Sequence, residues 1–122
     1  AGSTNDGDLY VQPLASMRPA MAPGSVRRNG GTTVSFGGNT GTESGLPIVS
    51  AYVRCYKDAQ GATELGGTAV NVTSAVQLSG TTISGSTALP ALFYQTQSVR
   101  FEVTLRGPNG NFTALSAPIA AY

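Results

Sequence analysis

Apolar and polar residues alternate with a period of two along much of this chain. The clearest run lies in residues 99–106, where four apolar side chains alternate with Arg100, Glu102, Thr104 and Arg106. Successive side chains of a strand point to opposite faces of a sheet, so this run predicts a strand with one buried and one wet face. Because Glu102 lies between two arginines, we expect it to form cross-strand ion pairs.

A second run, Pro47–Lys57, is apolar on both faces. Its two faces carry Ile48, Tyr52 and Tyr56 on one side and Val49, Val53 and Cys55 on the other. A strand that is apolar on both faces belongs in the interior of a sheet, so the pattern predicts a central strand. Cys55 has no second cysteine to pair with, and we expect it to be a buried small hydrophobe rather than a reactive thiol.

Further runs predict shorter strands separated by turn residues. They are Thr32–Phe36, Thr68–Leu78, Ala88–Tyr94, which carries a proline typical of an edge or bend, and Phe112–Ile119. The segment 107–111, Gly-Pro-Asn-Gly-Asn, predicts a tight turn that closes a hairpin onto the last of these runs. About seven short strands without helical periodicity predict an all-β fold, an antiparallel β-sandwich.

The N-terminal segment differs from the rest of the chain. Residues 1–31 hold three prolines, both methionines and one strand-like piece, Asp8–Leu14. Proline removes a backbone donor and favours extended conformation in the residue before it. We predict that residues 1–29 form an extended N-terminal arm and residues 30–122 a single sandwich domain. The alternative is that the strand-like piece adds a first strand to the core.

Two stretches carry a resemblance to a known family. TTVSF, a Gly-rich loop and GLPIVSAYVRCYKDAQG resemble the B strand, loop and C strand of a fibronectin type III domain. RFEVTLRGPNGNFTALSAPIAAY resembles its F–G hairpin. The resemblance spans residues 30–122 and implies a fibronectin type III or immunoglobulin-like sandwich. Phe36 stands where that family usually has a core Trp and Val99 where it usually has a corner Tyr, so a jelly roll is the alternative, and the fold implies no function.

The residue content argues against catalysis. The chain has no His, no Trp, one Cys and six acidic residues among 122, whereas His, Cys and clustered carboxylates are the usual proton shuttles and metal ligands. The nearest metal candidate, Thr4–Asp8, lacks the distal Glu of a calcium loop and is expected to be an exposed turn. We therefore predict a protein that is not an enzyme and has no cofactor and no metal site.

Charge limits the classes of partner. Only 11% of residues are charged, the net charge is +1, and Arg27-Arg28 is the one adjacent cationic pair, whereas nucleic-acid binders cluster their cations. No apolar run approaches the roughly 20 residues of a membrane helix. We expect neither nucleic acid nor a membrane as partner. Because the cores of protein interfaces are depleted in charge, the low charge predicts a surface buried against copies of the chain or a scaffold.

These observations lead to two functional hypotheses. The first is a non-catalytic structural interaction protein of the virion, such as a bacteriophage capsid decoration or cement protein, whose partner is the capsid or further copies in a homo-oligomer. The second is a carbohydrate-binding, adhesive or spacer module of a secreted or cell-surface bacterial protein, with a surface glycan as partner.

Residues of the N-terminal segment and the C-terminal residue are the predicted partner contacts: Tyr10, Val11, Leu14, Met17, Arg18, Met21, Arg27, Arg28 and Tyr122. Among the tyrosines, Tyr52 and Tyr56 are expected in the core. Tyr94 and Tyr122 stay open as platforms for a ligand, and Tyr122 is a candidate anchor against a partner.

Overall fold

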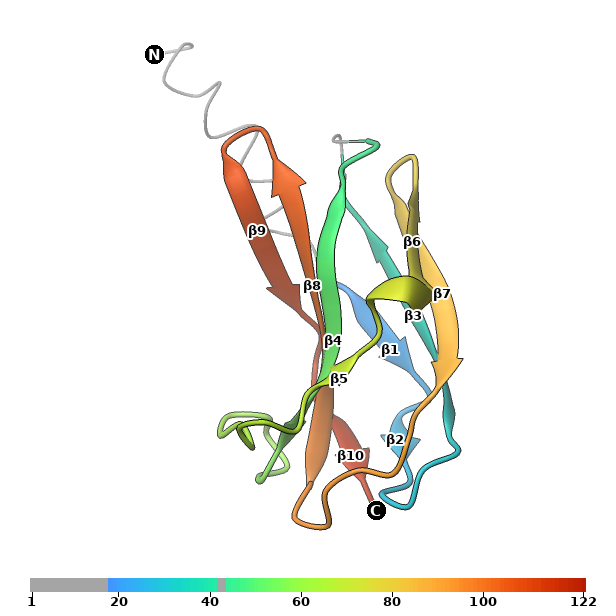
Figure 1. Ribbon diagram of the computed structural model, residues 1–122, viewed down its shortest axis with the longest axis vertical. Helices are drawn as coiled ribbons and strands as arrows, with labels where there is room; N and C mark the ends of the chain where they lie inside the picture. The colour runs from blue at the N-terminus through green and yellow to red at the C-terminus, as the bar shows by residue number, and fades with distance from the viewer. Residues whose placement is uncertain (1–17, 42–43) are drawn as a thin grey trace.

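The computed structural model describes residues 18–41 and 44–122, which form two β-sheets packed face to face (Figure 1). In chain order the elements are β1 (Ala20–Ala22), β2 (Ser25–Val26), β3 (Thr33–Asn39), β4 (Ile48–Tyr56), β5 (Val70–Asn71), the 3-10 turn η1 (Thr73–Ala75), β6 (Val76–Ser79), β7 (Thr82–Ala88), β8 (Ser98–Gly107), β9 (Gly110–Leu115) and β10 (Ile119–Ala121). The predicted all-β sandwich is confirmed.

The chain passes repeatedly from one sheet to the other. The first sheet has the strand order β1-β3-β7-β6, and the second has the order β2-β10-β8-β4-β5, with β9 also paired to β8. The crossings between β3 and β4, between β5 and β6, and between β7 and β8 make the topology a Greek key. Among the strands of the described residues, every pair is antiparallel except β2 with β10, which is parallel.

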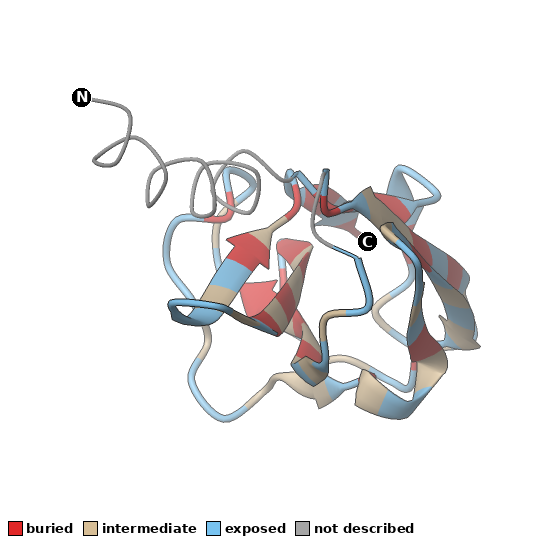
Figure 2. Cartoon of the chain, turned by 90° about the horizontal axis from the view of Figure 1, so that it is seen from above, coloured by how far each residue is buried: buried red, intermediate tan, exposed pale blue. Residues whose placement is uncertain are grey.

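Strand β8 forms the centre of the core, as its alternation predicts. Val99, Phe101, Val103 and Leu105 are fully buried, and the ring of Phe101 packs on Phe36 of the opposite sheet with centroids 4.5 Å apart. Each such side chain contributes roughly 1.5–3 kcal/mol on burial. Figure 2 shows buried segments on the strands of both sheets. The predicted hairpin is also confirmed, because residues 102–107 of β8 pair with β9 across a tight turn.

Strand β4 is central, as predicted, but its register holds a bulge. Ile48 pairs with Leu105 whereas Ser50 already pairs with Thr104, so Val49 has no partner across the ladder. A bulge reverses the parity of the side chains that precede it. Val49 is therefore 41% exposed while Val53 is fully buried, and the prediction that Val49 shares the buried face of Val53 is wrong.

The run Thr68–Leu78 is two strands in different sheets, not the single strand predicted. The Thr73 hydroxyl accepts a hydrogen bond from the Ala51 amide (2.9 Å) and donates to the Ala51 carbonyl (3.2 Å), while the Asn71 side-chain oxygen accepts from the Thr73 amide (3.0 Å). These side chains bond to backbone N–H and C=O groups that would otherwise pair between neighbouring strands, so the strand pairing ends here. The chain leaves the second sheet at β5, turns through η1 and enters the first sheet as β6.

Two further runs differ from their predictions. Ala88 ends strand β7, so the run Ala88–Tyr94 is mostly loop. The run Phe112–Ile119 is interrupted at Ser116, whose hydroxyl accepts from the Phe101 amide at 2.8 Å, and it resumes as β10 along the same strand β8. The proline at 118 fits this interruption because it offers no backbone donor.

The last part of the predicted N-terminal arm belongs to the sandwich and not to an arm. β1 pairs with β3, and β2 pairs in parallel with β10, after the chain passes through a cis Ala22–Pro23 peptide. Met21 and Val26 are buried in the core. Residues 20–26 therefore contribute one short strand to each sheet, and the sandwich begins before residue 30. Residues 1–17 lie outside the described residues.

Candidate functional site

The predicted contact residues fall into three groups. Tyr10, Val11, Leu14 and Met17 lie outside the described residues. Met21 is only 8% exposed and packs in the core from β1, which pairs with β3, so its predicted role as a partner contact is wrong. Arg18 is exposed at the start of the described chain. Arg27, Arg28 and Tyr122 remain, and the fold brings these three together.

The parallel pairing of β2 with β10 places Arg27 and Arg28 beside Tyr122. The Tyr122 amide donates to the Val26 carbonyl at 2.9 Å, and the Arg28 amide donates to the Tyr122 carbonyl at 2.6 Å. These bonds continue the ladder one residue beyond each strand. The site is thus held by backbone hydrogen bonds between segments far apart in the sequence.

The loop between β7 and β8 completes this end of the sandwich. The Leu92 amide donates to the Arg28 carbonyl at 2.6 Å, and the Gly31 amide donates to the Leu89 carbonyl at 2.9 Å. Gly30 has φ of 92°, and a Cβ there would lie 2.7 Å from the backbone nitrogen of Ala91. Only glycine fits this close approach without strain, so Gly30 allows the loop to lie directly against the segment that carries the arginines.

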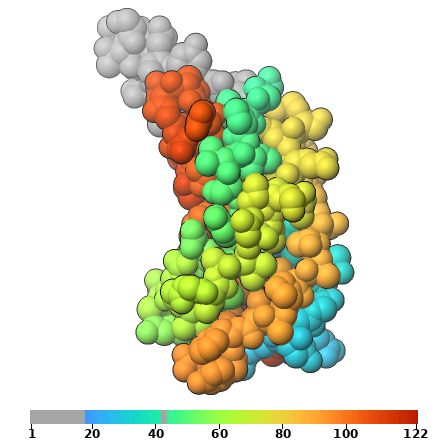
Figure 3. Space-filling model, viewed as in Figure 1, coloured from blue at the N-terminus to red at the C-terminus, as the bar shows by residue number. Residues whose placement is uncertain are grey.

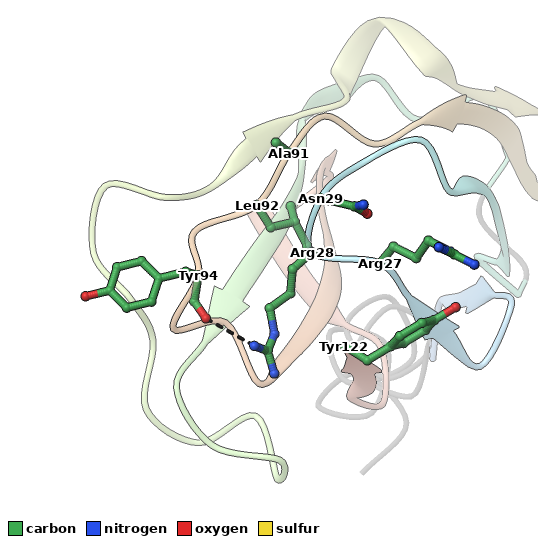
Figure 4. A pocket seen from close by; sticks show the side chains of 7 residues that line it. All are labelled: Arg27, Arg28, Asn29, Ala91, Leu92, Tyr94 and Tyr122. Atoms are coloured by element: carbon green, nitrogen blue, oxygen red, sulfur yellow. Dashed lines mark hydrogen bonds between the residues drawn. The ribbon is translucent and has the colours of Figure 1, made fainter.

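A hollow of about 460 Å³ opens between these segments (Figure 4). Its lining residues are Arg27, Arg28, Asn29, Ala91, Leu92, Tyr94 and Tyr122. In the space-filling view of Figure 3 the orange atoms of the loop between β7 and β8 mark this lower end of the molecule. We call these seven residues together with Phe93 the Arg-Tyr surface.

The two arginines of the Arg-Tyr surface have no acidic partner within the described residues. The Arg27 guanidinium carbon lies 5.8 Å from the centroid of the Tyr122 ring, a cation–π distance. Arg28 Nη1 donates to the Tyr94 carbonyl at 3.3 Å, whereas its Nε is buried without a hydrogen-bond partner in that part of the chain. No acidic side chain lines the hollow, and its charged and aromatic lining side chains are Arg27, Arg28, Tyr94 and Tyr122.

Exposed aromatic side chains gather at the same end. Tyr94 is 71% exposed, Tyr122 61% and Phe93 43%, and the rings of Phe93 and Tyr94 lie 4.7 Å apart. The fourth large exposed hydrophobic residue of the described chain, Val49, lies on β4 outside this surface. The sequence held a sign of the aromatic pair, because adjacent side chains of an extended segment point to opposite sides and cannot both face one core. Asn29, Leu92 and Phe93 were not predicted.

The charged cluster on the outer face of β4 and β8 has a structural role. Arg54 binds Glu102 through two hydrogen bonds of 2.7 and 3.0 Å and Glu64 through one of 2.8 Å, which confirms the predicted ion pairing of Glu102. The Glu102 carboxylate, followed by Glu64, holds the pKa of Arg54 above its usual range. Backbone amides of Ala62 and Thr63 likewise hold the pKa of Asp58 below its usual value.

The remaining groups show what chemistry this part of the chain can do. Cys55 is buried, as predicted, and burial raises the pKa of its thiol. Within residues 18–41 and 44–122 no group of three or more His, Cys, Asp or Glu side chains is placed to hold a metal ion. Over the same residues no helix has the length and hydropathy needed to cross a bilayer.

No protein-family model matches this sequence, and no curated protein matches it either.

Proposed function

We propose that this protein is a non-catalytic structural interaction protein that attaches to a larger protein assembly through the Arg-Tyr surface. We further propose that the assembly is a virus particle, on whose capsid the protein acts as a decoration or cement protein. The observation that carries the first proposal is the gathering of two arginines and three exposed aromatic rings at one end of a sandwich that is otherwise low in charge.

The composition of the Arg-Tyr surface supports protein binding. The cores of protein interfaces are enriched in Tyr, Phe and Arg and depleted in Lys, Glu and Asp, and Tyr and Arg supply many of the residues that dominate binding energy. The Arg-Tyr surface has the enriched types, and of the depleted types, which also include Ser and Ala, it holds Ala91 alone. Leaving rings such as Tyr94 and Phe93 in water has a cost, which burial against a partner would remove.

The rigidity of this surface supports the same function. Its three segments are joined by backbone hydrogen bonds, from Arg28 to Tyr122, from Leu92 to Arg28 and from Tyr122 to Val26. A binding surface that is already ordered loses less conformational entropy on association. The Arg27 and Tyr122 side chains are also in contact with each other before any partner binds.

The proposed assembly follows from the surface outside the site. Only 11% of the residues are charged, so Ser, Thr, Gly, Asn and Gln make up most of the polar surface. A surface of this kind suits close packing against a scaffold or further copies, since it brings few charges that must be desolvated. Assignment to a virus particle rests on similarity in type to small β-sandwich decoration proteins. The Greek-key order of the strands supports the resemblance to fibronectin type III and immunoglobulin-like sandwiches.

Co-sedimentation from the native source tests this proposal. Tagged wild-type protein should sediment with the assembly, and Tyr94→Ala should reduce the bound fraction because the Tyr94 side chain is exposed and contacts only its neighbours Phe93 and Gln95. A loss of about 2 kcal/mol, typical of a dominant interface residue, would weaken binding roughly thirtyfold. Val49→Ala is the control, because Val49 is exposed outside the Arg-Tyr surface. Protein that stays free of every particle would contradict the proposal.

A glycan-binding or adhesive module is the second candidate. It is favoured by the same exposed rings, because sugars stack on aromatic side chains, and by Asn29 at the rim of the hollow. The purified protein distinguishes the two functions. Saturable binding to a polysaccharide that Tyr94→Ala abolishes would support the glycan function, whereas attachment to a particle stripped of glycans would support the protein assembly.

A further inference from the structure

We infer that the hollow of the Arg-Tyr surface receives a carboxylate side chain from an acidic segment of the partner protein. This inference rests on the proposed function, because it names the chemistry by which the partner is recognised. It depends on the charge of the hollow and on the hydrogen-bond donors that its two arginines still offer.

Charge complementarity points to an anionic group. Arg27 and Arg28 both line the hollow, with their side chains pointing in different directions (Figure 4), and none of the lining side chains is acidic. Elsewhere in the described chain, Arg54 has two carboxylate partners and Arg100 donates to the carbonyls of Ser116 and Gly61. Arg27 and Arg28 differ from Arg54 because neither has an ion pair there, and from Arg100 because neither makes more than one side-chain hydrogen bond. An incoming carboxylate would supply the counter-charge that the fold supplies to Arg54.

The unused hydrogen-bond donors of Arg27 and Arg28 also favour an anionic ligand. A guanidinium carries five N–H donors in a planar fork that fits the two oxygens of a carboxylate. Among the described residues Arg28 uses one donor, in the 3.3 Å contact with the Tyr94 carbonyl, and Arg27 makes no side-chain hydrogen bond. Figure 4 shows the Arg28 guanidinium pointing toward the carbonyl of Tyr94 and the Arg27 guanidinium lying near the Tyr122 ring. Most of the ten donors thus remain for a ligand or for water.

The walls of the hollow favour a protein carboxylate over a small inorganic anion. Leu92 and the rings of Tyr94 and Tyr122 line the hollow beside the arginines. These apolar groups gain nothing from a bare phosphate, but they can pack on the methylene groups of a glutamate and on apolar neighbours in the same peptide. Removing water around the ion pair would also strengthen it.

An NMR titration of the whole 122-residue chain tests this inference. The probe is the capped peptide Leu-Glu-Glu-Leu, the matched control is Leu-Gln-Gln-Leu, and a third arm uses inorganic phosphate alone. We expect the Glu peptide to shift the amide signals of residues 27–29, 91–94 and 122, and to bind at least about tenfold more tightly than the Gln peptide. Raising the salt concentration should weaken this binding.

Variants locate the binding group. Arg27→Gln should weaken binding of the Glu peptide about tenfold, since it removes one exposed charged fork. Arg28→Lys keeps the charge but loses the fork, so it should also weaken binding. Arg106→Gln is the control, because Arg106 is an exposed arginine on β8 outside the hollow. Folding of each variant is checked by its amide spectrum, and Arg27→Gln removes a side chain with no role in the core.

Three results would overturn the inference: equal affinity for the Glu and Gln peptides, phosphate binding as tight as the Glu peptide, or signal shifts confined to other parts of the surface. If the Tyr94→Ala variant is lost from the assembly while the Glu peptide does not bind, the inference fails and the proposed function stands. If neither effect occurs, both fail.

Discussion

The backbone amide of Arg28 donates a 2.6 Å hydrogen bond to the carbonyl oxygen of Tyr122. This bond extends the parallel pairing of β2 and β10 past the end of both strands. The same backbone segment accepts the Leu92 amide, so three separate stretches of chain meet at one residue. The two arginines and the exposed tyrosines are therefore placed by main-chain geometry, and substitutions of their side chains should change binding without changing the fold.

Two N-terminal deletions should show how much strand β1 contributes to stability, compared with the residues before it. Removing residues 1–22 deletes β1 and the buried Met21, whereas removing residues 1–17 leaves both in place. We expect the larger deletion to lower the free energy of unfolding by at least about 2–3 kcal/mol more than the smaller one, since loss of a buried Met side chain alone costs about that much. Chemical denaturation of both proteins measures the difference, and equal stabilities would mean that β1 is not part of the core.

Aspartate at two positions of β4, Val49 and Val53, should have opposite effects on stability. Val53 is fully buried, so Val53→Asp places an unpaired carboxylate in the core and should cost about 4 kcal/mol or more. Val49 is turned outward by the bulge, so Val49→Asp should change stability by less than about 1 kcal/mol. Thermal melts of the two variants test the register of the strand. A Val49→Asp protein that unfolds would show that Val49 is buried and would contradict the bulge.

Substitution of alanine for two glycines should test whether the turn η1 packs closely against β7. At Gly85, where φ is 145°, a Cβ would lie 1.9 Å from the Ala75 carbonyl oxygen, whereas at Gly37 on β3 it would meet nothing within 4 Å. We expect Gly85→Ala to destabilise the protein by about 3 kcal/mol or more and Gly37→Ala by less than about 1 kcal/mol. Denaturation midpoints of the pair give the comparison. Similar midpoints would show that η1 does not lie against β7.

The buried thiol of Cys55 predicts a pH dependence of stability. Burial raises its pKa above the ordinary value of 9.0, so the folded protein keeps the proton that the unfolded chain releases. This contribution is complete below pH 9 and is lost as the pH rises through the folded pKa. The stability of the wild type should therefore fall relative to Cys55→Ala above about pH 9. A constant difference between the two from pH 7 to 10.5 would contradict the burial of the thiol.

Accessibility of the same thiol gives a prediction at neutral pH. Cys55 is fully buried, and its sulfur lies 3.5 Å from the Thr68 carbonyl. A thiol reagent should label it only at the rate at which the protein opens, and rapidly in denaturant. Labelling of the native protein at the rate of a small-molecule thiol would place Cys55 at the surface.

The sequence predicted those strands whose buried face can be recognised from the order of their own apolar and polar residues. The alternation of residues 99–106 gave the buried face of β8, and the apolar run around Val53 gave the central position of β4. Strand β7 was not predicted because its large inward side chain is Ile83 alone, and the neighbouring turn requires glycine at position 85. The bulge at Val49 was not predictable either, since it is a property of the pairing with β8 and not of β4 by itself.

The candidate site was predicted in part. Arg27, Arg28 and Tyr122 were expected to contact a partner, and Tyr94 was left open, but no sequence pattern shows that the four meet. Their convergence depends on the parallel pairing of two short strands and on the close approach that Gly30 allows. Met21 was assigned to the partner because its proline-rich surroundings suggested an arm. Three ladder pairs with β3 outweigh that local tendency.

Tyrosine footprinting in the native assembly tests the central claim most directly. The protein is treated with a tyrosine-modifying reagent free and within the assembly, and modification of each tyrosine is measured by mass spectrometry. Tyr94 and Tyr122 are 71% and 61% exposed in the free chain, so both should react when free and be protected within the assembly. Tyr52, which was expected in the core but is only half-buried beneath the Arg54 guanidinium, is the internal control and should react equally in both states. Equal reactivity of Tyr94 and Tyr122 in the two states would contradict attachment through the Arg-Tyr surface.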